Sequence, residues 1–133
     1  MKWEQINKSL QGHFAANWLV TPVDYLNTKF IQPENSPWVR MQVVPNEARF
    51  ASVGSIGGGV CVRSIGLVSV TVFVPEGSTE TLANQYADDI AAIFFGQEID
   101  GILLRDSGRS APRIDDGWYQ TTITIPFELD TFH

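Results

Sequence analysis

The chain has 133 residues, of which 44% are hydrophobic and 18% charged, and this balance excludes a disordered protein and predicts one folded domain. No apolar run approaches the roughly 20 residues of a membrane span, and a cleaved secretion signal is not expected at the N-terminus. The single cysteine and two histidines exclude an internal disulfide framework and a cysteine-cluster zinc site. The net charge of −6 argues against general affinity for nucleic acid, although an acidic wall suits a channel through which DNA slides.

The first third of the chain predicts one helix and one clear strand. Apolar residues recur at spacings of three and four in Trp3–Asn17, which predicts an amphipathic helix. Val23–Phe30 alternates loosely and is expected to hold a short edge strand. Trp38–Val44 alternates strictly, as strands do, and Pro45 is expected to end it.

The middle of the chain predicts a long loop, a strand and a second helix. Residues 46–61 contain four glycines and are expected to be irregular. Leu67–Val74 is rich in β-branched residues and predicts a strand. Ser78 is the expected N-cap of a helix whose apolar stripe runs from Leu82 to Phe94, and Gly96 stands where a glycine stop belongs.

The last third predicts strands separated by a polar turn. Gln97–Leu104 is expected to be a short strand with Gly101 as a bulge. Residues 106–117 combine a turn signal with polar residues. Trp118–Leu129 alternates as a strand, in which Pro126 belongs at an edge or a bulge because it cannot donate a hydrogen bond.

This order of elements predicts an α+β fold in a single domain, residues 1–133. We expect a mixed, mostly antiparallel sheet with two helices packed on one face, plus a long Gly-rich hairpin loop. No internal repeat or linker divides the chain.

Three motifs are candidates for phosphate binding, acid–base or metal chemistry, and nucleophilic catalysis. Gly54–Gly59 lacks the Lys-Ser/Thr pair and the helix that follow a phosphate loop, so a hairpin tip is favoured. Asp115 and Asp116 suit a turn better than acid–base or metal chemistry, because adjacent strand residues point apart. Cys61 lacks a nearby histidine in sequence, which disfavours a nucleophile. No cofactor, metal or catalytic residue is therefore predicted.

The tryptophans and arginines have competing interpretations. Trp118 and Tyr119 can stack on a ligand or pack in the core, and the core is favoured for them and for the other tryptophans. Arginine forms paired bonds with carboxylates at protein interfaces, although solvated surface charge is the simple alternative. With the glycines of the loop, the candidate interface residues are Arg40, Arg49, Gly57, Gly58, Gly59, Arg63, Arg109 and Arg113.

Several segments together resemble a known family. They are Ala15–Trp18 at the end of the first helix, Pro37–Arg40 before the Gly-rich loop, Val68–Gly77, Asp116–Gln120 and Ile125–Glu128. This pattern covers nearly the whole chain and resembles the tail terminator, or tail completion, proteins of long-tailed phages, in particular the lambda-terminator-like group.

The resemblance implies a structural virion protein and no enzyme. Such proteins form a hexameric ring on the tail tube, end its polymerisation and offer a surface for the head–tail connector proteins. The implied partners are further copies of the chain, the tube protein and the connector, with DNA passing through unbound and no membrane involved. The implied location is the head-proximal end of the virion tail, after assembly in the host cytoplasm.

Mechanistic expectations follow from this resemblance. Residues 46–66 are expected to reach the adjacent subunit or the tube, with Arg49 and Arg63 pairing acidic groups there. Asp88, Asp89 and Asp100 are candidates for the lumen wall. A head–tail joining (neck) protein, a small enzyme using Asp115 or Asp116, and a monomeric ligand-binding module remain the alternatives.

Overall fold

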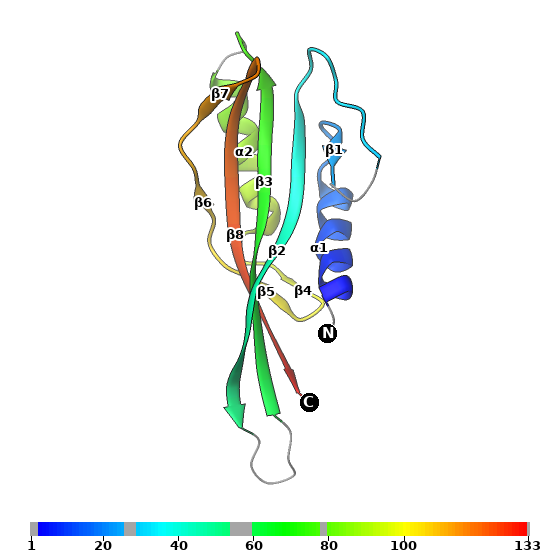
Figure 1. The fold of residues 1–133 in the computed structure, drawn as a ribbon, viewed down its shortest axis with the longest axis vertical. Coiled ribbons are helices and arrows are strands. Elements are labelled where there is room, and N and C mark those ends of the chain that lie inside the picture. Colours follow the sequence, from blue (N-terminus) through cyan, green and yellow to red (C-terminus); the bar gives the residue numbers. More distant parts are fainter. Residues whose placement is uncertain (1–2, 26–28, 54–59, 78–79, 133) are drawn as a thin grey trace.

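The computed structural model describes residues 3–25, 29–53, 60–77 and 80–132, and it confirms an α+β fold with two helices and a mostly antiparallel mixed sheet (Figure 1). The elements in chain order are α1 (Trp3–Asn17), β1 (Val23–Asp24), β2 (Trp38–Val53), β3 (Val60–Pro75), α2 (Glu80–Phe94), β4 (Glu98–Ile99), β5 (Ile102–Leu104), β6 (Gly108–Arg109), β7 (Arg113–Asp115) and β8 (Trp118–Phe132). The strand order is β1-β2-β3-β8-β5-β4, and β6 and β7 also pair with β8. Among the strand pairs that the structure describes, only β1–β2 is parallel.

The two helices follow the predicted apolar periodicity. The predicted bounds of α1 are confirmed, and Ile6, Leu10 and Phe14 are its buried residues. The predicted Ser78 cap lies outside the described residues. Gly96 adopts a φ of 64° just after α2, which confirms the expected glycine stop, because the left-handed region suits a residue without a side chain. Neither described helix is long and apolar enough to cross a membrane.

The β2 and β3 strands are much longer than expected. Pro45 does not end β2; the β2–β3 register shifts between Pro45 and Glu47, and the strand continues to Val53. A strand at a bulge with one open side tolerates the missing proline N–H. The expectation that residues 46–61 are irregular is therefore wrong for 46–53 and 60–61. The predicted loop tip, residues 54–59, lies outside the described residues.

The extra strand length builds a projecting arm. We call the arm the part of β2 from Glu47, of β3 up to Ile65 and of β8 from Glu128; these three residues share one row of the sheet. Figure 1 shows the arm extending beyond the ends of both helices. Its backbone stands outside the helix-covered core.

Two Asp-Gly turns produce hairpins. Gln97–Leu104 is not one strand with a bulge: β4 and β5 pair through Asp100-Gly101, with φ of 51° and 86°. Asp116-Gly117 joins β7 to β8 in the same way, with φ of 54° and 81°. Positive φ at both central residues defines the type I′ turn, which matches the twist of hairpin strands.

The main core lies between the helices and alternating residues of the long strands. One cross-strand row contains Met41, Val70 and Ile123, all buried, and belongs to the same apolar cluster as the buried residues of α1 and α2. Phe14 of α1 stacks on Phe94 of α2, with ring centroids 5.7 Å apart. This core anchors both helices to the sheet.

Pro126 lies inside β8 and still avoids a lost hydrogen bond. Its carbonyl accepts from the Arg105 N–H at 2.8 Å, so its backbone faces the side of β8 away from β3. β5 ends at Leu104 and β6 begins at Gly108, so Pro126 lies opposite the interval between them. Pro126 therefore lies at an open position only on the side of β8 that faces away from β3, while β8 stays paired with β3 on the other side.

Candidate interaction surfaces

The predicted interface arginines are distributed over four strands. Arg40 lies in β2, Arg63 in the arm on β3, Arg109 in β6 and Arg113 in β7. Arg49 also lies in β2, but its side chain is outside what the structure describes, as are Gly57, Gly58 and Gly59.

The four of these arginines whose side chains the structure describes all pair with carboxylates of their own chain. Arg63 donates from Nε and from a terminal nitrogen to the two carboxylate oxygens of Asp130, at 2.9 and 3.2 Å. This hydrogen bonding lowers the pKa of Asp130. Partial desolvation of the carboxyl raises the pKa by less, and the positive charge of Arg63 lowers it further. Arg109 forms an ion pair with Asp88 of α2. Contacts of Arg63 or Arg109 with another subunit stay a prediction.

Arg40 and Arg113 line one groove, of about 280 Å³, on the sheet face opposite the main core. The other residues that line it are Thr71, Phe73, Ser110, Ala111, Gln120 and Thr122. The Arg40 Nε donates to buried Asp24 at 3.2 Å. Its guanidinium carbon lies 5.4 Å from the Trp38 ring centroid and 5.3 Å from that of Phe73, which fixes the charge over two aromatic faces.

An aromatic cluster supports this groove. Trp38 stacks on Phe73 with centroids 4.0 Å apart, and Trp118 meets Trp38 edge to face at 6.0 Å. Phe30 packs on the same cluster. The preference for a packing role of Trp38 and Trp118 is therefore confirmed.

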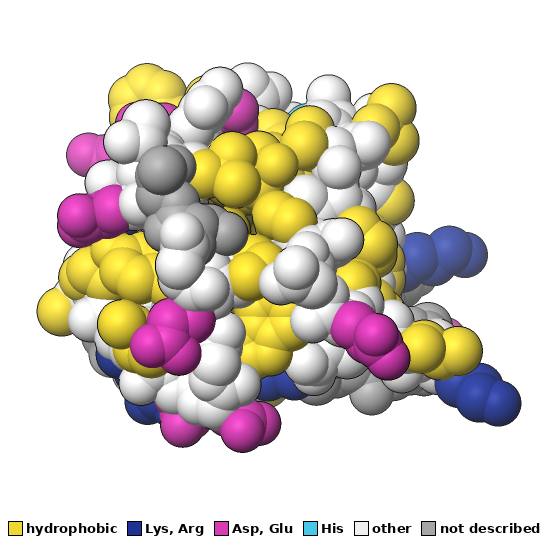
Figure 2. Space-filling model, turned by 90° about the horizontal axis from the view of Figure 1, so that it is seen from above, with side chains coloured by type: hydrophobic (Ala, Val, Ile, Leu, Met, Phe, Trp, Pro, Cys, Tyr) yellow, Lys and Arg dark blue, Asp and Glu magenta, His cyan; other side chains and the backbone are white. Residues whose placement is uncertain are grey.

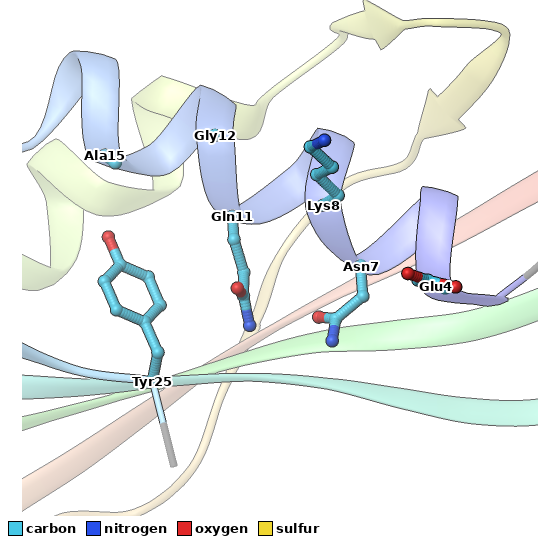
Figure 3. A pocket seen from close by; sticks show the side chains of 7 residues that line it. All are labelled: Glu4, Asn7, Lys8, Gln11, Gly12, Ala15 and Tyr25. Atoms are coloured by element: carbon cyan, nitrogen blue, oxygen red, sulfur yellow. The ribbon is translucent and has the colours of Figure 1, made fainter. Parts of the chain in front are cut away.

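A second groove, of about 480 Å³, runs along α1 (Figure 3). It is lined by Glu4, Asn7, Lys8, Gln11, Gly12, Ala15 and Tyr25. Figure 3 shows the Asn7 and Gln11 amides directed from the helix toward the sheet, with Gln11 nearer the Tyr25 ring. Partial burial raises the pKa of the Tyr25 hydroxyl, so it stays a neutral hydrogen-bonding group near pH 7.

Several large apolar side chains are exposed to solvent outside the two grooves. Figure 2 views one end of the molecule, where hydrophobic side chains gather with acidic side chains around them. The large exposed apolar residues are Leu19, Val20, Ile31, Phe95 and Ile114. Their positions in separate segments were not predicted, because a single apolar residue outside a periodic pattern carries no signal of its own.

Among the side chains that the structure describes, the aspartates and the histidine considered for enzymatic chemistry lie in separate places, and the side chain of Cys61 is outside what it describes. Asp115 and Asp116 lie at the β7–β8 turn, where Asp115 forms an ion pair with Arg113 at 3.2 Å. His13 lies 2.9 Å, through its Nε2, from the carbonyl oxygen of Ile93, in a helix–helix contact. Within the ranges that the structure describes, no three His, Cys, Asp or Glu side chains gather as metal ligands do.

Comparisons with known proteins agree with this architecture. A solved structure superposes on the chain with a TM-score of 0.71 and 22% identity, covering 100% of this chain and 98% of the other; it shows the fold alone. No curated protein sequence matches the chain. The family model described as phage tail terminator protein matches residues 5–127. The chain therefore belongs to the phage tail terminator protein family, a structural family of the phage tail.

Proposed function

We propose that the protein forms a closed ring, of about six copies, that caps the tail tube, ends polymerisation of the tube protein and offers the surface for joining the head. Family membership over residues 5–127 supports this role. The ring is assembled in the host cytoplasm, stands at the head-proximal end of the tail and lets DNA pass without specific binding. Contacts with tube and connector proteins complete the proposal.

Two open strand edges support the ring. Among described residues, β1 covers the outer side of β2 only opposite Val39 and Arg40. At the other side of the arm, β8 pairs with β5 up to Glu128 and beyond it with β3 alone. Open edges bind further strands, and two different edges on one chain allow a head-to-tail contact, which generates a ring when the rotation closes.

The arm is the proposed reach toward the neighbour or the tube. It carries residues 47–53 and 60–65, with the backbone of Arg49 and of Arg63, away from the helices (Figure 1). In-chain pairing with Asp130 pre-orients Arg63, which also lies 4.0 Å from Glu128, and the Arg63 and Asp130 side chains are each 43% exposed. Asp89 and Asp100 are exposed candidates for the lumen wall, whereas Asp88 is engaged by Arg109.

A proline placed on the open edge tests the ring. The Val39 N–H donates outward to Pro22, so by alternation the Val43 N–H also points outward, past the end of β1. Val43→Pro removes that outward donor and leaves the bonds to β3. Gln42→Pro is the contrast, because it removes an N–H that faces β3 and so weakens the fold itself. Val43→Thr controls for the lost apolar side chain.

The measurements are light-scattering mass with negative-stain imaging, and tube length when the protein is mixed with polymerising tube protein. We expect rings and short tubes for the wild type and Val43→Thr, and folded, ring-deficient protein for Val43→Pro. Wild-type protein that stays monomeric and leaves tube length unchanged would contradict the proposal. Binding to the connector without any effect on tubes would favour a neck protein, and monomers that bind a small ligand would favour a binding module.

A further inference from the structure

We infer that the groove between Arg40 and Arg113 binds a carboxylate side chain of a second copy of this chain. The inference rests on the proposed ring and names the subsite through which one subunit holds the next. The two arginines are separated by 73 positions in sequence, and the groove that they share exists only in the folded sheet.

The sheet register places the two charges at opposite ends of the groove. One cross-strand row contains Arg40 of β2, Thr71 of β3 and Thr122 of β8. The next row on the same face of the sheet contains Phe73 of β3, Gln120 of β8 and Arg113 of β7. β2 and β7 are three strand spacings apart, about 14 Å, so two arginine side chains reach over the floor from both sides.

The lining supplies donors for an anion. It contains two guanidinium groups, the hydroxyls of Thr71, Ser110 and Thr122, and one amide. Asp24 and Asp115 of the same chain each pair with one of the guanidinium groups. The Thr71 and Thr122 hydroxyls share a hydrogen bond of 3.0 Å, and the Ser110 hydroxyl accepts from the Thr122 N–H at 3.1 Å. These bonds hold the floor in place, which lowers the ordering cost when an acceptor enters.

The two arginines differ in readiness to exchange partners. Asp24 holds Arg40 through Nε, and a guanidinium has further N–H donors on its two terminal nitrogens. The Arg113–Asp115 pair is exposed, with side chains 70% and 61% accessible, so its contribution to stability is small. An incoming carboxylate can replace Asp115 at low cost while Arg40 stays fixed as the anchor.

Size and charge favour a protein carboxylate. A groove of about 280 Å³ has room for one side chain. The chain has 15 acidic and 9 basic residues, so a second copy presents carboxylates while the same excess repels DNA phosphates. If each copy offers one groove and inserts one carboxylate side chain into the groove of the next copy, the contact is head-to-tail, as a ring requires.

A cross-linking experiment tests the contact directly. Arg113→Lys keeps the positive charge and adds an amine that a carbodiimide can couple to a touching carboxylate. Wild-type protein and the variant are compared in mixtures of nitrogen-14 and nitrogen-15 labelled chains, so that mass spectrometry separates links between copies from links within one. We expect links between copies from position 113 to one acidic peptide. Links only to Asp115 of the same chain would overturn the inference.

Charge removal tests the energetics. Arg40→Gln with Arg113→Gln should raise the concentration for half-assembly by at least about tenfold. Arg105→Gln is the matched control, because it removes an exposed arginine outside the groove that pairs with Glu128. Replacing both groove arginines by lysine should restore part of the assembly. Because Arg40 also pairs with buried Asp24 in its own chain, the Tm of every variant is measured beside its assembly, and a double glutamine variant with unchanged Tm and lost assembly supports the inference.

The outcomes separate the two proposals. If the wild type forms rings that shorten tubes and the double glutamine variant does so equally well, the groove inference fails and the proposed function stands. If that variant assembles normally but loses binding to labelled DNA, the groove binds phosphate and the inference is overturned. If the wild type neither assembles nor shortens tubes, the proposed function fails. The groove inference then fails too, because no second copy binds in the groove.

Discussion

Gly66 is the glycine whose missing side chain matters most to the described fold. It is buried in β3 opposite Pro45, at the β2 bulge. A Cβ there would lie 2.6 Å from the Val44 carbonyl oxygen and 2.7 Å from Cζ of Phe127. The oxygen belongs to the backbone and the ring is buried, so neither moves aside cheaply.

We expect Gly66→Ala to lower the free energy of unfolding by about 1–3 kcal/mol through overpacking. Gly12→Ala is the matched control, because a Cβ in that exposed turn of α1 meets nothing within 4 Å. It should raise stability by about 1 kcal/mol through helix propensity. Urea denaturation of both variants measures the contrast, and equal stability of Gly66→Ala and wild type would contradict the close packing described.

The Arg63–Asp130 pair predicts a pH dependence of stability. The hydrogen bonds from Arg63 lower the pKa of Asp130 below 3.8 in the folded state, so the pair stabilises the fold above pH 3.8 and is lost as the pH falls through the folded pKa. Asp130→Asn should therefore lower Tm near pH 7 and lose its effect in strong acid. Because the pair is exposed, the change should be small.

Thermal unfolding at several pH values measures this effect. Arg63→Gln should reduce the same acid-dependent part of Tm, and the double variant should add little to either single change. Additive effects would show that the two side chains stabilise the fold independently.

At the scale of elements, the Asp-Gly turns set the hairpins. Gly101 has a φ of 86°, and a Cβ there would lie 3.4 Å from Cδ1 of Leu129. Gly101→Ala should lower the free energy of unfolding by about 1–2 kcal/mol, because L-residues with side chains disfavour this region. Asp100→Asn should be nearly neutral, since Asn adopts the φ of 51° that Asp100 holds. Chemical denaturation compares the two, and a neutral Gly101→Ala would contradict the turn assignment.

Two local sequence signals, at Gly101 and Pro45, led to wrong predictions of strand boundaries. Asp-Gly between alternating residues is a strong hairpin signal, yet one strand is predicted over Gln97–Leu104, with Gly101 as a bulge. The structure instead has two short strands joined by Asp100-Gly101. Pro45 was interpreted as a strand end, although a bulge at an open side accommodates a proline. The Pro45 error arises because the pairing with β3, which is distant in sequence, decides whether a proline ends the strand. The Gly101 error is different, because the Asp-Gly signal for a hairpin is local.

At the scale of the whole molecule, the groove predicts a salt effect. From about 0.1 to about 1 M NaCl the screening length falls from about 10 to about 3 Å, so contacts between arginine and carboxylate weaken. We expect the wild-type ring to need higher protein concentrations at high salt. The Arg40→Gln, Arg113→Gln variant should show a smaller salt dependence, measured by light-scattering mass. Equal salt dependence of both proteins would place the ionic contact elsewhere.

The sequence by itself determined the two helices, the α+β class and the family. The bounds of α1 follow from apolar residues within a few positions of each other, and the family pattern is a series of short local segments. Such features need no knowledge of distant neighbours, because helix periodicity and turn chemistry act within a few residues.

Only the tertiary structure decided the length of β2 and β3, the open edges and the groove. Strand pairing joins residues far apart in the chain, so the register that puts Arg40 beside Thr71 and Arg113 beside Gln120 is not contained in either local segment. Arg63 and Arg113 looked alike as surface arginines in the sequence. Both pair with a carboxylate in the folded chain, Arg63 with Asp130 across the arm and Arg113 with Asp115 of its own strand, but only Arg113 also lines the groove, because cross-strand neighbours determine the surroundings of each side chain.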